Sequence, residues 1–360
     1  MTLDPDAFAK LLVDYCLEVE AGDEVLVRST TLATPLMLAL QRAIMQRDAW
    51  ALLRPELEGE QRGFLENASD RHLDLFPKLA YEESRRFDKS IGIQAPFAFG
   101  ELDGIDPDSL GRLARARQDL RDNASNKRWC LTLWPTPALA QRAGLDLDEY
   151  GAFVQRALFL DQEDPVAAWR GLGAFQDTLV ASVSKAREIR IEAQGTDLTM
   201  SVHKRQWVNS EGKRNMPSGE IFTGPVEESV NGVIEFDIPS SPPGVAVSGV
   251  RLVFKDGEVV ESSAAEGEDY LRKALATDEG ARRVGELGIG SNFGISQPTG
   301  MILLDEKIGG TVHIALGRAY PETGSKNRSA IHWDMICDLR NGGRLSVDGE
   351  ALQIDGKFVI

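Results

Sequence analysis

Apolar residues in the first half of the chain alternate between helical and strand spacing. Residues 6–19 carry apolar side chains at helical intervals, which predicts a helix, and a short strand is expected at 24–27. Thr34-Pro35 predicts the start of a second helix, and Asp106-Pro107 places a capping residue before a proline at the first helical position of another. Further strands are expected at 89–93 and 129–133, and further helices at 148–158 and 165–183. Strands that alternate with helices predict an α/β layer with a mostly parallel sheet.

The second half has the pattern of β structure. Hairpins are predicted around Gly195-Thr196-Asp197, within residues 188–202, and around Lys255-Asp256-Gly257. Turn signals recur at Asn341-Gly342-Gly343, Asp348-Gly349 and Asp355-Gly356, and one helix is expected at 268–284. The fold class is therefore α/β plus α+β: an N-terminal α/β domain at 1–186 and a C-terminal, β-rich domain with one helix at 187–360. A chain of 360 residues is long enough for two such cores.

Composition and charge exclude several classes of function. The formal net charge is −16, and a negative field of that size repels phosphate backbones, so nucleic-acid binding is not expected. No apolar stretch approaches the roughly 20 residues that a membrane span needs, and the acidic start lacks the features of a secretory signal. The three cysteines are scattered and odd in number, which suggests no disulfide framework. These features together predict a cytoplasmic protein without a membrane partner.

Two of the four histidines lie in segments that have the pattern of buried strands. Alternation places His313 on the strand face opposite Val312 and Ile314. In the next candidate strand, His332 and Asp334 are two positions apart and share a face. A histidine and an aspartate so placed are spaced to ligate one ion, although each residue taken singly is as readily a hydrogen-bonded core residue.

Carboxylates in apolar surroundings add weight to the metal hypothesis. Glu220 lies in a glycine-bounded apolar segment, Glu286 lies among glycines and aliphatic residues, and Glu306 follows the apolar run 301–304. A buried carboxylate needs a positive partner or a metal to offset the cost of desolvation. Because these segments show no matching cluster of lysines or arginines, a metal ion is the simpler partner.

A series of motifs in the C-terminal half resembles the thermophilic aminopeptidase family, which includes aminopeptidases T and S. In order along the chain, the motifs are Gly219-Glu-Ile-Phe-Thr-Gly-Pro225, Glu286-Leu-Gly-Ile-Gly290, Leu304-Asp-Glu306, Val312-His-Ile-Ala-Leu-Gly317, Tyr320 and Ile331-His-Trp-Asp-Met335. The resemblance covers the whole C-terminal half, whereas the N-terminal half matches only in architecture.

The resemblance implies both an activity and a set of site residues. It implies a dinuclear metallo-aminopeptidase, a hydrolase that acts on short peptides with a free N-terminus. The implied ligands of two divalent ions are Glu220, Glu286, Glu306, His313, His332 and Asp334, with Glu306 either a ligand or only a neighbour of the ligands. Tyr320 matches a tyrosine beside the metals, and relatives are dimers, so a homodimer is expected.

The mechanism that follows is metal-assisted hydrolysis. The donor set suits Zn²⁺, Co²⁺ or Mn²⁺, and Mg²⁺ less well. By analogy with the family, Glu286 bridges two ions that activate a water for attack on the scissile carbonyl. Glu220 or Glu306 would carry a proton to the leaving amine, and Tyr320 would donate a hydrogen bond to the oxyanion.

Two other functions stay open at this point. Some relatives resemble ferrous ring-cleaving dioxygenases, and a single iron could use a subset of the same ligands. The chain could also be a divalent-metal-binding protein without turnover. Two features are given structural interpretations: the glycines at 288, 290 and 294 are expected to form turns at the metal site, and Cys337 is expected to lie in the core.

Overall fold

The structure, a computed structural model, describes residues 3–240 and 245–359 and divides into two compact units. The first unit is Met1–Val166 together with Gly212–Met216, and the second is Ala167–Glu211 together with Pro217–Ile360. The sequence places a boundary at 186, after helix α10 (Pro165–Val183), whereas in the structure nearly all of this helix belongs to the second unit. None of the described helices has the length and apolarity needed to cross a membrane.

The first unit is built on a four-stranded, entirely parallel sheet, as the alternation of strands and helices predicts. Its order is β2 (Trp50–Glu56), β1 (Glu24–Thr30), β3 (Lys89–Gln94) and β4 (Arg128–Leu133). The edge strand β2 is not among the elements predicted from the sequence. The helices are α1 (Pro5–Leu11), α2 (Thr34–Met45), α3 (Glu60–Asn67), α4 (Asp70–Asp74), α5 (Lys78–Arg86), α6 (Pro107–Ala116), α7 (Gln118–Ser125), α8 (Pro137–Arg142) and α9 (Leu147–Ala157).

Local capping explains where several of these helices begin. The side chain of Asp106 accepts hydrogen bonds from the backbone N–H groups of Asp108 and Ser109. Helix α6 starts at Pro107, directly after this capping residue. Helix α2 starts at Thr34, with its proline in the first turn, as predicted. The first predicted helix is shorter than expected as an α-helix, because α1 passes into a π-helical turn at Leu12–Cys16.

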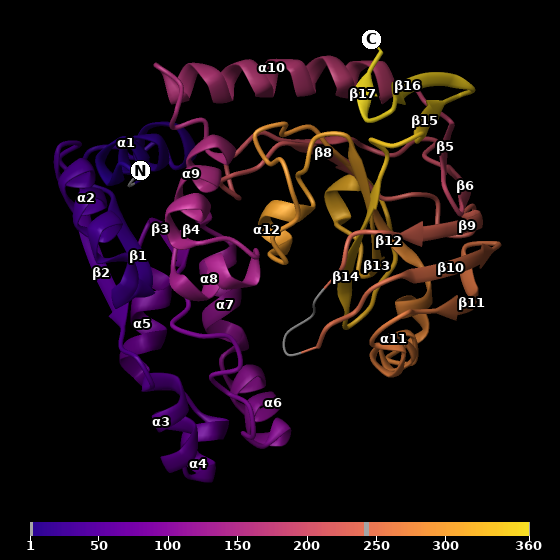
Figure 1. Cartoon of the computed structure of the whole chain (residues 1–360). Coiled ribbons are helices and arrows are strands. Elements are labelled where there is room, and N and C mark those ends of the chain that lie inside the picture. Colours follow the sequence, from indigo (N-terminus) through magenta and orange to yellow (C-terminus); the bar gives the residue numbers. More distant parts are fainter. Residues whose placement is uncertain (1–2, 241–244, 360) are drawn as a thin grey trace. The chain divides into compact units, whose positions relative to one another are not determined.

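Two antiparallel sheets form the second unit (Figure 1). The eight-stranded sheet has the order β11 (Glu258–Ser263), β10 (Val250–Lys255), β9 (Asn231–Phe236), β6 (Thr196–Ser201), β5 (Glu188–Ala193), β15 (Arg344–Val347), β16 (Glu350–Ile354) and β17 (Lys357–Phe358). The five-stranded sheet has the order β14 (His332–Asp338), β13 (Thr311–Gly317), β12 (Val284–Gly290), β8 (Glu220–Thr223) and β7 (Val208–Ser210). Both predicted hairpins, β5–β6 and β10–β11, are present.

The helix predicted at 268–284 is too long. Helix α11 spans Glu268–Leu275, and a short 3₁₀ turn at Glu279–Arg282 follows it. Asp278 breaks the run because its side chain accepts a hydrogen bond from the N–H of Ala281 and so starts the new turn. Val284 then opens β12. A second helix, α12 (Ile302–Asp305), lies between β12 and β13.

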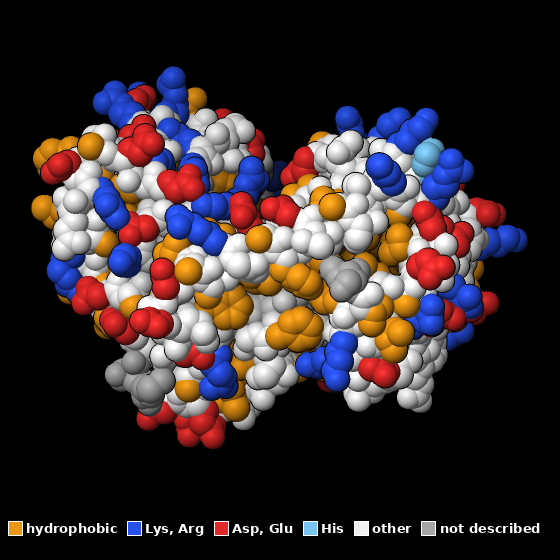
Figure 2. Space-filling view, turned by 90° about the horizontal axis from the view of Figure 1, so that it is seen from above, with side chains coloured by type: hydrophobic (Ala, Val, Ile, Leu, Met, Phe, Trp, Pro, Cys, Tyr) orange, Lys and Arg blue, Asp and Glu red, His pale blue; other side chains and the backbone are white. Residues whose placement is uncertain are grey.

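A large apolar core lies in the second unit and packs against one face of the five-stranded sheet. Strands β12, β13 and β14 of that sheet contribute these residues to it: Val284, Leu287, Ile289, Val312, Ile314, Leu316, Trp333, Met335 and Cys337. Cys337 therefore lies in the core, as predicted, and all three cysteines are free and buried. On the face shown in Figure 2, acidic and basic side chains are interspersed, so the net negative charge is not concentrated in one patch there.

Candidate metal centre

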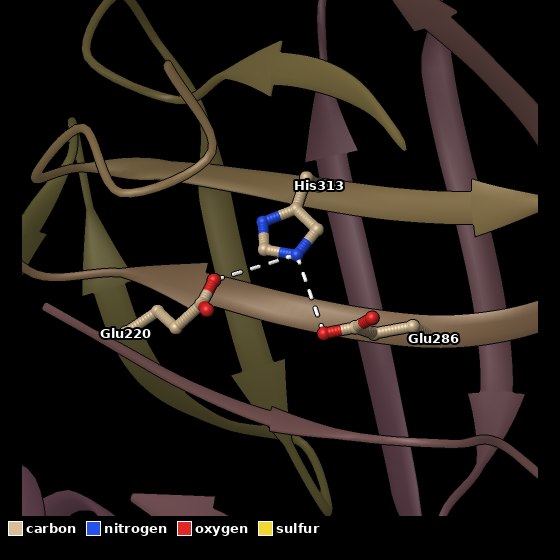
Figure 3. A group of neighbouring side chains, drawn as sticks. All are labelled: Glu220, Glu286 and His313. Carbon is tan, nitrogen blue, oxygen red and sulfur yellow. Dashed lines mark ion pairs between the residues drawn. The ribbon is translucent and has the colours of Figure 1, made fainter. Parts of the chain in front are cut away.

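The face of the five-stranded sheet opposite the core carries five of the six predicted ligands, and the sixth, Glu306, follows α12. Glu220 opens β8, Glu286 lies in β12, His313 lies in β13, and His332 and Asp334 share one face of β14. Figure 3 shows Glu220 and Glu286 converging on the imidazole of His313 from two neighbouring strands. The structure therefore brings together residues that lie up to 114 positions apart in the sequence, between 220 and 334.

A β-bulge puts Glu286 on this face. The pairing of β12 with β13 shifts between Val284 and Glu286, with Gly285 as the extra residue. Simple alternation would place Val284 and Glu286 on the same side of the strand. With the bulge, Val284 lies in the core while Glu286 points to the opposite face. Gly285 is required there, because a Cβ would approach the carbonyl oxygen of Gly317 to 2.4 Å.

Small residues make room for the ligands on the same face. Gly288 pairs with His313, and a Cβ at Gly288 would lie 1.9 Å from Cε1 of the imidazole. Ala315 pairs with Glu286 on one side and with Asp334 on the other. The interpretation of the glycines at 288 and 290 as turn residues is wrong: both lie inside β12, where the absence of a side chain allows close packing.

Both histidines are oriented by backbone carbonyl groups. Nδ1 of His313 donates a hydrogen bond to the carbonyl oxygen of Glu306 at 3.1 Å, and Nδ1 of His332 donates to that of Arg318 at 2.7 Å. When Nδ1 carries the proton, the lone pair of a neutral imidazole is on Nε2, which faces the carboxylates in both residues. This is the arrangement in which proteins present histidine to a metal.

The spacing of the donor atoms fits ligands around ions better than it fits hydrogen bonds. Nε2 of His313 lies 3.5 Å from Glu220 Oε2 and 3.6 Å from Glu286 Oε1. Nε2 of His332 lies 3.3 Å from Glu286 Oε2 and 3.5 Å from Asp334 Oδ1. Hydrogen bonds of this type measure about 2.7–3.2 Å. Two ligand atoms at about 2.1 Å from one tetrahedral ion are about 3.4 Å apart.

Two carboxylate oxygens of the cluster are buried without a hydrogen bond. Among the described residues, Glu220 Oε2 and Asp334 Oδ1 are such atoms, and each faces the Nε2 of a histidine. A buried oxygen without a hydrogen bond is costly unless a cation meets it. Three overlapping groups could hold a metal: Glu220, Glu286 and His313; Glu286, His332 and Asp334; and Glu306, His313 and Asp334. The donor set therefore fits divalent ions.

Attraction between the histidines and the carboxylates of the cluster favours the charged forms of both. Burial by itself lowers the pKa of both histidines, but their carboxylate neighbours outweigh it and raise the pKa of His313 to about 9 and that of His332 to about 11. Burial raises the pKa of Glu286 and Asp334, yet their histidine partners reverse the effect and leave both pKa values lowered. In the metal-free protein, protons on the histidines thus compensate part of the negative charge.

Lys307 is a member of the cluster that the sequence analysis missed. Its side chain is fully buried, and its Nζ lies 2.8 Å from Glu220 Oε1 and in direct contact with Glu306 Oε1. The expectation that no basic residue accompanies these carboxylates is therefore wrong. The adjacency of Glu306 and Lys307 was the available signal. In a strand, adjacent side chains face opposite ways, so adjacency in the sequence would not predict a contact. Glu306 and Lys307 follow α12 outside any strand, and their side chains can meet.

Glu306 and Tyr320 lie at the edge of the cluster. Burial raises the pKa of Glu306 to about 8, against the opposing effect of Lys307. Burial also raises the pKa of Tyr320 well above its ordinary value, so its hydroxyl keeps its proton and can donate a hydrogen bond. The Tyr320 ring lies between His332 and Phe222, with ring centroids 5.1 Å and 5.5 Å away. Phe222, which the sequence analysis did not single out, thus helps to fix the tyrosine beside a candidate ligand.

Comparisons with known proteins show the family of the chain. A profile of the thermophilic metalloprotease family (M29) matches residues 4–358. Aminopeptidase T of Thermus aquaticus is 29% identical over 394 residues, covering 98% of this chain and 95% of that protein. Aminopeptidase 2 of Geobacillus stearothermophilus is 28% identical over 405 residues, covering 98% and 94%.

Two solved structures have folds similar to that of this chain. Wild-type AmpT from Thermus thermophilus has a TM-score of 0.86 and 25% sequence identity, with 99% of both chains covered. A 2,5-dihydroxypyridine dioxygenase from Pseudomonas putida KT2440 has a TM-score of 0.58 at 15% identity, covering 99% of this chain and 96% of that one. The second likeness is one of fold alone.

Proposed function

Because the chain belongs to the thermophilic metalloprotease (M29) family, we propose that it is an aminopeptidase that removes N-terminal residues from short peptides at a site for two divalent ions. The aminopeptidases among its relatives, similar over nearly their whole length, support this substrate class. Zn²⁺, Co²⁺ and Mn²⁺ suit the mixed imidazole and carboxylate donors, and Mg²⁺ suits them less.

One observation carries the proposal of two ions: the two oxygens of Glu286 face two different histidines. Oε1 lies 3.6 Å from Nε2 of His313, and Oε2 lies 3.3 Å from Nε2 of His332. With Glu220 beside the first histidine and Asp334 beside the second, each oxygen belongs to its own three-residue donor group. In this proposal Glu286 would help to hold both ions.

The surrounding side chains suit the other steps of peptide hydrolysis. When bound, divalent ions would supply a water of lowered pKa and an electrophile for the scissile carbonyl. Glu306, with a pKa of about 8, is suited to take up a proton near neutral pH and to return it to the leaving amine. Tyr320 keeps its hydroxyl proton and can donate it in a hydrogen bond to the developing oxyanion. The remaining candidate for proton transfer, Glu220, is better suited as a ligand, because its Oε2 accepts no hydrogen bond among the described residues.

The experiment that tests this function is a panel of aminoacyl anilides and dipeptides offered to metal-stripped protein. Each divalent ion is added back separately, and every substrate is paired with its N-acetylated form. Activity that returns with an ion and is lost on acetylation supports an aminopeptidase. Absence of hydrolysis with every ion, in protein that binds the ions, would overturn the proposal.

The same samples separate the proposal from the two other functions. A ring-cleaving dioxygenase would consume oxygen with a dihydroxypyridine and Fe²⁺, and an oxygen electrode measures this directly. A metal-binding protein without turnover would bind ions and be inactive in both assays.

Two further parts of the proposal rest on the resemblance to the family. We expect a homodimer, which sedimentation of the full chain would show as twice the mass of 39.5 kDa. We also expect the protein in the cytoplasm, where cell fractionation with a tagged chain would locate it.

A further inference from the structure

Lys307 is a buried cation inside a cluster of carboxylates. It is the only lysine or arginine with a fully buried side chain among the residues that the structure describes. Burying an ammonium is costly unless it is paired, and Lys307 is paired twice, with Glu220 and with Glu306. These two carboxylate contacts offset the cost of burying its charge.

The backbone holds this lysine in place. Its N–H donates to the carbonyl oxygen of Leu304 at 3.0 Å, and its carbonyl oxygen accepts from the N–H of Asn292 at 3.1 Å. Gly290 allows the segment to pack closely, because a Cβ there would lie 2.0 Å from the carbonyl oxygen of Ile308. The segment also supplies the carbonyl of Glu306 that orients His313. Lys307 is thus fixed by the same structure that positions a candidate ligand.

The contact with Lys307 gives the two oxygens of Glu220 different surroundings. Oε1 lies 2.8 Å from the ammonium, whereas Oε2 faces His313 and accepts no hydrogen bond from any described residue. Glu306 is bound to the same ammonium through its own Oε1. One cation therefore takes one oxygen from each of two carboxylates.

We propose that Lys307 is a positioning residue and a fixed internal cation of the metal site. By contacting Oε1 of Glu220 and Oε1 of Glu306, it leaves each carboxylate only its other oxygen to offer to an ion. This inference rests on the proposed function, because it assumes that divalent ions bind at the cluster. It adds an electrostatic role that no ligand performs.

The electrostatic consequence has a definite sign. When the carboxyl groups of Glu220, Glu286, Glu306 and Asp334 are all ionised and the histidines are neutral, the one ammonium among them leaves three net negative charges. Removing the ammonium makes the site more negative and should strengthen its attraction for divalent ions. The metal-free protein should become less stable, because Glu220 and Glu306 would then lack their partner. A lysine with only a packing role would instead weaken both stability and metal binding when removed.

The test compares Lys307→Met with the unchanged protein, both stripped of metal. Affinity for Zn²⁺, Co²⁺ and Mn²⁺ is measured by competition with a chromophoric chelator, and melting is recorded with and without each ion. We expect Lys307→Met to bind ions at least about tenfold more tightly. Its melting temperature should be lower than that of the unchanged protein without metal and should rise by more when an ion is added. Unchanged or weaker binding by folded Lys307→Met would overturn the inference.

Two further variants make the result interpretable. The double variant Glu306→Gln/Lys307→Met removes the pair, whose charges cancel when Glu306 is ionised, so its affinity should return close to that of the unchanged protein. It also serves if Lys307→Met alone does not fold: an affinity more than about tenfold above or below that of the unchanged protein would then contradict an electrostatic role of Lys307. Lys326→Met, at an exposed lysine, should leave affinity unchanged. If the unchanged protein binds no ion, the proposed function itself fails, whereas normal binding without tightening in Lys307→Met defeats only the role of Lys307.

Discussion

Gly288 lies directly opposite His313 in the pairing of β12 with β13, and the imidazole occupies the space where any side chain at 288 would lie. The distance from a Cβ at Gly288 would be 1.9 Å to Cε1 of His313 and 2.2 Å to its Nε2, the atom that faces the carboxylates. The position of this candidate ligand thus depends on the absence of a single methyl group on the neighbouring strand.

Gly288→Ala should therefore displace the imidazole of His313. We expect the affinity for divalent ions to fall about tenfold or more, in the range seen when support of a ligand is lost. Isothermal titration of the stripped variant measures this. Gly171→Ala is the matched control, because a Cβ at Gly171 meets no atom within 4 Å. Equal affinities for Gly288→Ala and the control would refute the role of Gly288.

Glu286 places one oxygen beside His313 and the other beside His332, whereas Asp334 is proposed as a ligand only of the ion beside His332. Glu286→Gln should consequently lower the content of both ions, while Asp334→Asn should leave the ion beside Glu220 and His313 in place. Metal content per chain, measured by mass spectrometry after gel filtration, distinguishes the two variants. If Glu286→Gln kept both ions, Glu286 would not help to hold both of them.

Tyr320→Phe should slow turnover without loss of metal. Because the hydroxyl is proposed to stabilise the oxyanion only in the transition state, kcat should fall by about 10²–10³-fold with little change in KM. Tyr270→Phe is the control: Tyr270 packs edge-on against Trp333 at 5.3 Å between ring centroids and has no proposed role in the reaction. A Tyr320→Phe variant with unchanged kcat would remove the tyrosine from the mechanism.

Metal binding should release protons. In the metal-free protein the pKa of His313 is about 9 and that of His332 about 11, so both rings are protonated at pH 7, yet a ligating Nε2 must be neutral. Affinity should therefore rise with pH, by about tenfold per pH unit for each proton released. Titration calorimetry in buffers of different ionisation enthalpy counts these protons. A count of zero at pH 7 would contradict this prediction: either the histidines are already neutral in the metal-free protein, or they do not bind the ion.

Much of the second unit follows from local patterns in the sequence. Alternation in the strands of His313 and Asp334 correctly places both side chains on the face opposite the apolar core, because each strand has its other face in that core. Turn residues give the correct hairpins at Gly195 and Gly257. These features depend on neighbours close in sequence, which a single chain reveals.

What the sequence could not supply depends on contacts between distant segments. The bulge at Gly285 inverts the alternation of β12, so the face of Glu286 is decided by pairing with β13 and not by its own strand pattern. Lys307 is buried only because the segment after α12 turns both it and Glu306 toward Glu220. The early end of α11 depends on the cap at Asp278, which competes with helical spacing that continues beyond it.

The most direct test of the proposed activity compares two substrates with one protein sample. Metal-stripped protein is given an unblocked dipeptide and its N-acetylated form, before and after addition of Co²⁺, Zn²⁺ or Mn²⁺, with Glu286→Gln treated in parallel. The account predicts that only the unblocked peptide is cleaved, only after an ion is added, and not by Glu286→Gln. Cleavage of both peptides, cleavage without any ion, or full activity of Glu286→Gln would contradict it.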